Sequence, residues 1–175
     1  MPVYVALLRA VNVGGTGALT MAELKAICQK LSFADVATYI QSGNVVFRAD
    51  GSGATVQARL EAALAERMGT ATGVILRSAA EMQAATDRVP FPDAEPNQLL
   101  VTFLPEPPPA DALDRLSAPG GEQVVIVGRE TYIHYPDGIG RLKLKLPALQ
   151  TGTARNLNTV RKLAEMAAAL ETDGN

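Results

Sequence analysis

The stretch Val36–Arg48, with the sequence VATYIQSGNVVFR, constrains the fold more than any other part of the chain. Two apolar runs, Val36–Ile40 and Val45–Phe47, flank the four residues QSGN. A Ser-Gly-Asn sequence supplies the positive backbone φ that a tight turn requires. The flanking Thr, Tyr, Ile, Val and Phe side chains suit a pleated, half-buried surface. The stretch therefore predicts a β-hairpin in the middle of a sheet.

Strands and helices are predicted on both sides of this hairpin. Val3–Arg9 is a short apolar run that is typical of a buried strand. A capping box that begins at Thr20 predicts a helix over 21–31. A second helix has an apolar residue at every fourth position and ends at Gly69. With a further strand at Val74–Leu76, this part of the chain has the order β-α-β-β-α-β, which indicates a ferredoxin-like unit.

The second half of the chain mixes helix and strand signals in the same way. A helix is predicted over 78–88, a strand over Gln98–Leu104, and a hairpin from Val124–Val127 and Thr131–Tyr135. A last helix begins after a cap, for which Asn156 and Asn158 are the two candidates.

These elements predict an α+β fold with two parts. We expect residues 1–90 to form a ferredoxin-like βαββαβ subdomain, and residues 91–175 to form a smaller α+β subdomain with a closing helix. The length of 175 residues also fits a single continuous domain.

The chain has one cysteine, Cys28, and one histidine, His134. An intrachain disulfide is therefore impossible, and a conventional zinc site lacks ligands. We expect no metal and no cofactor. Cys28 falls on the apolar face of the predicted helix, which indicates a buried and inert thiol. No nucleophile motif accompanies His134, so we expect it to be structural.

Composition also limits the partners. The net charge of −2 and the pI of 5.4 give no global basic field, so nucleic acid is an unlikely partner. The N-terminus lacks a basic leader with a long apolar core, and no apolar run approaches the ~20 residues of a membrane span. We therefore expect a soluble cytoplasmic protein, without a membrane partner, that is a monomer or a weak dimer.

Positive charge is concentrated in one segment near the C-terminus. Between Arg141 and Lys162 there are six cationic residues and no anionic one. Cations beside hydroxyl groups and a helix N-terminus suit the recognition of phosphate or carboxylate. The alternative is a solvated face that balances the acidic residues of 91–140. The candidate ligand-binding residues here are Lys143, Arg155, Asn156 and Asn158.

A second candidate region follows the first predicted strand. The glycine-rich stretch 12–17 lies between a strand and a helix, where backbone amides can hold phosphate. Neither a Walker motif nor a dinucleotide fingerprint is present. Ordinary turn chemistry is the alternative interpretation. The candidates are Arg9, Asn12, Gly14 and Gly15 in this region, and Gln41, Ser42 and Asn44 in the hairpin turn.

Four segments resemble a known family. They are LLRAVNVGG (7–15), MAEL (21–24), TYIQSGNVVF (38–47) and TARNLNTVRKLAEMA (153–167). In this order they are similar to the bacterial family of proteins with domain of unknown function 1697. The resemblance implies an α+β fold with a ferredoxin-like N-terminal part, and no established reaction. It favours a helix or loop over 141–149, whereas the alternation of Leu with Lys or Arg there is typical of a strand.

Together, these features favour the binding of a small anionic or phosphorylated ligand between the two halves. One alternative is a nucleic-acid-binding module on the open sheet face. Another is an enzyme that acts on a phosphorylated metabolite. The sequence assembles no acid, base and nucleophile, so it leaves open whether the protein is an enzyme, and it assigns no catalytic residue.

Overall fold

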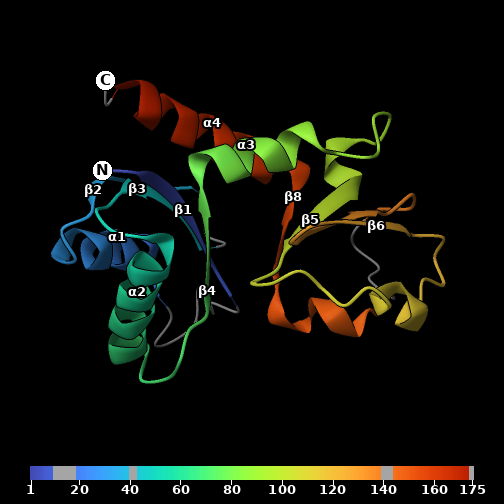
Figure 1. The fold of residues 1–175 in the computed structure, drawn as a ribbon, viewed down its shortest axis with the longest axis horizontal. Coiled ribbons are helices and arrows are strands. Elements are labelled where there is room, and N and C mark those ends of the chain that lie inside the picture. Colours follow the sequence, from blue (N-terminus) through green and yellow to red (C-terminus); the bar gives the residue numbers. More distant parts are fainter. Residues whose placement is uncertain (10–18, 40–42, 139–143, 174–175) are drawn as a thin grey trace. The chain divides into compact units, whose positions relative to one another are not determined.

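A computed structural model describes residues 1–9, 19–39, 43–138 and 144–173. Its contacts divide the chain into two compact units, Met1–Gln83 with Leu163–Asn175, and Ala84–Lys162. Each unit contains one four-stranded sheet (Figure 1). All neighbouring strands in both sheets are antiparallel. The predicted α+β class is therefore confirmed.

The first unit follows the predicted element order. Its strands are β1 (Val3–Leu8), β2 (Ala34–Thr38), β3 (Asn44–Arg48) and β4 (Val74–Ser78), and its first two helices are α1 (Met21–Lys30) and α2 (Gly53–Met68). The strand order in the sheet is β2-β3-β1-β4. Two further helices, α3 (Ala79–Asp87) and α4 (Leu157–Asp173), have residues in both units.

The hairpin of the central stretch is present. Ala37 pairs with Val46 and Thr38 with Val45 in an antiparallel register, and Gly43 has the positive φ, 81°, that the turn requires. Its place in the sheet was predicted only in part. β3 lies between two strands, but β2 is at the edge. A turn sequence decides which two strands are neighbours, but carries no signal about what lies beyond them.

Local caps mark the ends of both helices, and those at Thr20 and Gly69 were predicted. The Thr20 side chain accepts a hydrogen bond from the Glu23 N–H (3.0 Å) before α1, and Ser52 accepts one from the Thr55 N–H (3.2 Å) before α2. Gly69, with φ of 74°, ends α2. The apolar faces of both helices pack with one face of the sheet in a core that includes Leu24, Cys28, Val56, Leu60, Leu64, Tyr4, Ala6 and Phe47.

The second unit also has mostly the predicted elements. Its sheet has the order β6-β7-β5-β8, from the strands β5 (Leu99–Phe103), β6 (Gln123–Val127), β7 (Glu130–His134) and β8 (Thr153–Asn156). Short 3₁₀ helices occupy η1 (Pro96–Gln98), η2 (Ala112–Arg115) and η3 (Pro147–Thr151). The hairpin of β6 and β7 was predicted, whereas β8 was not.

The described residues contain neither a membrane-spanning helix nor a cluster of metal ligands. None of the helices in these ranges has the length and hydrophobicity that crossing a bilayer requires. In the same part of the chain, no group of three or more His, Cys, Asp or Glu side chains is placed to hold a metal ion.

Candidate functional site

The C-terminal end of β1 is where the first unit brings candidate residues together. The Leu8 N–H donates to the Gly43 carbonyl (2.9 Å), and the Arg9 N–H donates to the Gly73 carbonyl (2.8 Å). The end of β1 therefore lies between the turn of the β2–β3 hairpin and the residue before β4. Asn44 is also at this end of the sheet, because it pairs with Leu7.

The Arg9 side chain has a defined place at this end. A Cβ atom on Gly73 would lie 3.1 Å from the Arg9 Cδ and 3.4 Å from its Nη1, closer than most real contacts. Because glycine has no Cβ atom, Gly73 leaves room for the Arg9 side chain beside it. Arg9 is half-buried, so part of the residue stays exposed to solvent.

Asn44 has a structural task at the same end. The residue is 0% exposed, and its Nδ2 donates to the Tyr39 carbonyl (3.0 Å). The backbone of the same pair is also bonded, from the Tyr39 N–H to the Asn44 carbonyl (3.1 Å). These two contacts close the hairpin, and the first satisfies a buried amide group.

The C-terminal candidates lie at the junction of β8 and α4 in the second unit. Arg155 is only 7% exposed, and its Nη1 donates to the Thr153 Oγ1 (2.5 Å) and the Ala154 carbonyl (2.9 Å). Burial lowers the pKa of its guanidinium to about 10. Arg155 is therefore a buried cation that donates to two neutral oxygens. This residue does not belong to a solvent-exposed charged face.

The two asparagines next to Arg155 have different surroundings. Asn156 is the cap of α4, because its Oδ1 accepts a hydrogen bond from the Thr159 N–H (2.8 Å). Asn158 is exposed on the first turn of the helix. The remaining candidates, Asn12, Gly14, Gly15, Gln41, Ser42 and Lys143, lie outside the described residues.

The sheet faces bear on the nucleic-acid alternative. Alternate residues of a strand point to opposite faces, and in the first sheet both sets are buried. Ala6 and Phe47 pack toward the helices, while Val5, Leu7 and Val46 on the other face are 0% exposed. The same face also carries Asn44, Arg48 and Arg77, which pair with Leu7, Val3 and Val5 of β1. The nucleic-acid alternative therefore stays a prediction.

Within the described part of the chain, neither Cys28 nor His134 forms a catalytic arrangement. Cys28 is fully buried, as expected, and desolvation raises the pKa of its thiol to about 12, which disfavours the reactive thiolate. The ring of His134 lies 5.6 Å from the ring of Phe91 (centroid to centroid), beside a cavity of about 230 Å³ that Asp93 and Gln123 also line.

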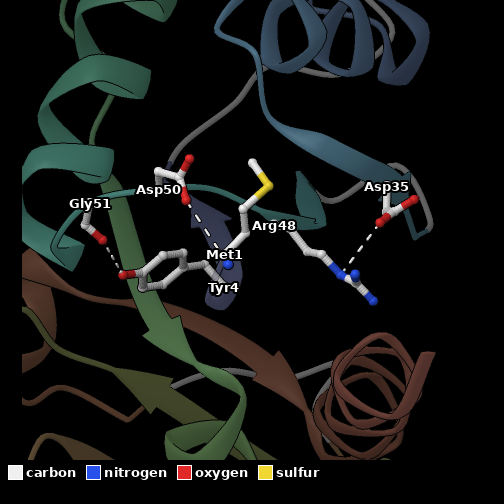
Figure 2. Close-up of polar contacts among 6 residues, drawn as sticks. All are labelled: Met1, Tyr4, Asp35, Arg48, Asp50 and Gly51. Atoms are coloured by element: carbon white, nitrogen blue, oxygen red, sulfur yellow. Dashed lines mark hydrogen bonds and ion pairs between the residues drawn. The ribbon is translucent and has the colours of Figure 1, made fainter. Parts of the chain in front are cut away.

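Nothing in the sequence singles out the polar contacts at the other end of the first sheet. Figure 2 shows the Arg48 guanidinium facing the Asp35 carboxylate, 3.4 Å away, and the Tyr4 hydroxyl donating to the Gly51 carbonyl (2.8 Å). Arg48 also donates from Nη2 to the Leu170 carbonyl in α4. A charged residue at the end of an apolar strand was the only available signal for Arg48.

These observations define the class of the chain as an α+β protein with two antiparallel sheets. The sequence model of the family described as "Protein of unknown function (DUF1697)" matches residues 1–132. Since this match covers most of the 175 residues, the chain belongs to the DUF1697 family, as the resemblance implied.

A comparison with solved structures supports the fold. The chain is similar to "conserved bacterial protein SP0830 from Streptococcus pneumoniae", with a TM-score of 0.76 and 24% sequence identity. The similarity covers 95% of this chain and 98% of that chain. At this identity it shows a shared fold and no more. A search of curated proteins gave no match.

Proposed function

We propose that the first unit binds a small anionic ligand, a phosphorylated or carboxylate compound, at the end of the sheet marked by Arg9. The observation that carries this proposal is the packing of Arg9 against Gly73. A guanidinium presents several N–H donors in a planar fork that matches carboxylate and phosphate oxygens. Because the Arg9 side chain already packs against Gly73, less side-chain freedom is lost when a ligand binds.

The neighbouring chain segments support the same location. The glycine-rich residues 12–17 begin three positions after Arg9 in the sequence, and backbone amides in such stretches can complete a binding site for an anion. Arg155 is a weaker candidate, because it is only 7% exposed. A guanidinium buried to this extent is poorly accessible to a ligand from solvent.

The test compares ligand binding in matched variants. Isothermal titration with inorganic phosphate, pyrophosphate and a nucleoside monophosphate would be run on the wild type, Arg9→Gln and Arg161→Gln. Arg161 is exposed in α4 and serves as a charge-matched control. Loss of one charge-assisted hydrogen bond predicts at least roughly tenfold weaker binding for Arg9→Gln alone. Equal affinity in all three proteins, or no binding by the wild type, contradicts the proposal.

The enzymatic alternative needs its own readout. If the ligand that binds best is a phosphorylated metabolite, incubation with the wild type followed by ³¹P NMR distinguishes a binding protein from an enzyme. Unchanged phosphorus signals support binding alone. New signals that are absent with Arg9→Gln would place a reaction at the same site.

We also propose that the first unit is a ferredoxin-like subdomain. Three features support this interpretation: the element order β-α-β-β-α-β, the strand order β2-β3-β1-β4, and the packing of α1 and α2 in one core with the sheet. Such subdomains host unrelated functions, so this fold assignment adds no argument about the ligand.

A further inference from the structure

We propose that β6 is an interaction edge, through which two copies of the chain pair their second sheets in an antiparallel arrangement. β6 is the first strand in the order β6-β7-β5-β8, so only one of its sides is paired within the sheet. The inference concerns the second unit and does not depend on the proposed ligand site of the first.

The sequence of β6 lacks the features that usually protect an edge strand. It reads QVVIV, with no charged residue and no proline, and its four aliphatic side chains are all half-buried. Its pairing with β7 is regular from Gln123 to Val127, without a bulge. A regular, apolar edge of this kind is a template for pairing with another strand.

The geometry of the hairpin shows which backbone groups are available. The turn between β6 and β7 has two residues, Gly128 with φ of 61° and Arg129. In such hairpins the residues that flank the turn, here Val127 and Glu130, form a hydrogen-bonded pair. Because hydrogen-bonded pairs alternate along an antiparallel ladder, the backbone N–H and C=O groups of Val124 and Ile126 point away from β7.

These outward groups are available for a new strand. Within the described ranges, no backbone hydrogen bond outside the β6–β7 ladder involves Val124 or Ile126. Unpaired N–H and C=O groups along a strand gain partners when a second strand adds to the edge.

The other three edges of the two sheets differ from β6. The pairing of β2 is interrupted by a bulge that contains Asp35, a charged residue with φ of 52°. The first four residues of β4 are buried. β8 has only four residues, and Arg155 is one of them. Bulges, charges, short length and coverage are the devices that prevent pairing at edges, so β6 is the one that remains suited to it.

A second copy of the chain is the occupant that the charges favour. In a two-fold pairing centred on Val125, Val124 lies opposite Ile126 of the partner subunit, and both outward residues of each strand find partners. Glu122 precedes β6 and Arg129 follows it. Antiparallel pairing therefore brings the acidic end of each strand to the basic end of the other, at both ends of the interface.

The test measures the mass of the full chain in solution. A five-residue edge buries little surface, so we expect a weak dimer that exchanges with monomer. Sedimentation equilibrium from micromolar to millimolar concentration should show the average mass rising from 18.4 kDa toward twice that value. A mass that stays at 18.4 kDa over the whole range overturns the proposal.

Variants decide whether β6 is the interface. Val125→Lys places two like charges opposite one another at the two-fold axis and should abolish the dimer. The matched control is Ala37→Lys, because Ala37 is a half-buried residue on the edge strand β2 of the other sheet. This variant should dimerise as the wild type does. Equal dimerisation of Val125→Lys and wild type overturns the proposal, with circular dichroism confirming that each variant is folded.

A charge reversal avoids any change within the strand itself. Glu122→Arg and Arg129→Glu should each weaken the dimer, because each creates like-charged neighbours across the interface. The double variant restores opposite charges and should dimerise more strongly than either single variant. Additive weakening in the double variant contradicts the two-fold antiparallel pairing. A wild type that stays monomeric but binds an extended peptide at β6 also overturns the second copy as occupant.

Discussion

The Arg48 Nε lies 3.4 Å from the Oδ2 of Asp35, and Asp35 has a backbone φ of 52° (Figure 2). This is the left-handed region, which residues other than glycine rarely adopt and which Asp and Asn tolerate best. Asp35 lies where the pairing of β2 with β3 shifts its register. The ion pair therefore joins the irregular part of the edge strand to the end of the neighbouring strand.

The first prediction separates the backbone role of Asp35 from its charge. Asp35→Ala should lower the free energy of unfolding by about 1–2 kcal/mol, because alanine loses the ion pair and also tolerates a positive φ poorly. Asparagine also tolerates a positive φ, so Asp35→Asn loses only a partly exposed charge. Its free energy of unfolding should fall by less than about 1 kcal/mol. Urea denaturation measures both. Equal losses would show that the backbone conformation contributes nothing.

The second prediction concerns the C-terminal helix. Arg48 also donates a hydrogen bond to the Leu170 carbonyl, near the C-terminal end of α4, where a cation is favourable. Arg48→Met should therefore speed hydrogen exchange in the last turns of α4 by about tenfold, an opening free energy lower by about 1.4 kcal/mol. Asp35→Asn leaves this bond intact and is the control. Unchanged exchange in Arg48→Met would mean that other contacts hold the helix.

Much of the fold was readable from local chemistry. The Ser-Gly-Asn turn, the cap at Thr20 and the stop at Gly69 each act within a few residues, so the sequence shows them directly. The short strand β8 was missed, because its sequence TARN has no apolar alternation. It is a strand because it pairs with β5, about fifty residues earlier in the chain.

The arrangement of the candidate residues was harder to predict than the fold, for a related reason. Arg9 and Gly73 are far apart in the sequence, and only the sheet register brings them together. The burial of Arg155 depends in the same way on the pairing of β8. Asn44 and Asn156 were candidate ligand-binding residues because their side chains are polar. In the structure, the Asn44 side chain bonds within the β2–β3 hairpin, and the Asn156 side chain caps α4.

The third prediction tests the close approach of Gly152 to β5. A Cβ atom at this position would lie 2.6 Å from the Phe103 carbonyl oxygen and 2.8 Å from the Leu104 Cδ2. Gly152→Ala should therefore lower the free energy of unfolding by about 1–3 kcal/mol in urea denaturation. Gly53→Ala is the control, since its Cβ would have no neighbour nearer than 3.8 Å. A control loss as large as that of Gly152→Ala would remove the steric explanation.

The fourth prediction concerns stability at alkaline pH. Burial raises the pKa of the Cys28 thiol from 9.0 to about 12. Above pH 9 the unfolded chain therefore loses this proton while the folded chain keeps it, so stability falls as pH rises between these two values. The slope from this group approaches about 1.4 kcal/mol per pH unit. Cys28→Ala should flatten the decline between about pH 9 and pH 10, and an unchanged slope would contradict the assignment.

The last prediction tests a buried hydroxyl group in the second sheet. Thr131 is 0% exposed, and its Oγ1 has no hydrogen-bond partner within the described part of the chain. A buried hydroxyl without a partner costs about 1–3 kcal/mol of desolvation. Valine has nearly the same shape and no hydroxyl, so Thr131→Val should raise the free energy of unfolding by about 1 kcal/mol. Urea denaturation measures the change.

Thr131→Ser is the matched control for that change, because it keeps the hydroxyl and removes the methyl group. It should lower stability by about 1 kcal/mol, through a lost methyl contact and a small void. The two variants therefore move in opposite directions if the hydroxyl is unsatisfied. A loss of stability in both would mean that the hydroxyl is bonded in solution, with a partner that Thr131→Val removes and Thr131→Ser retains.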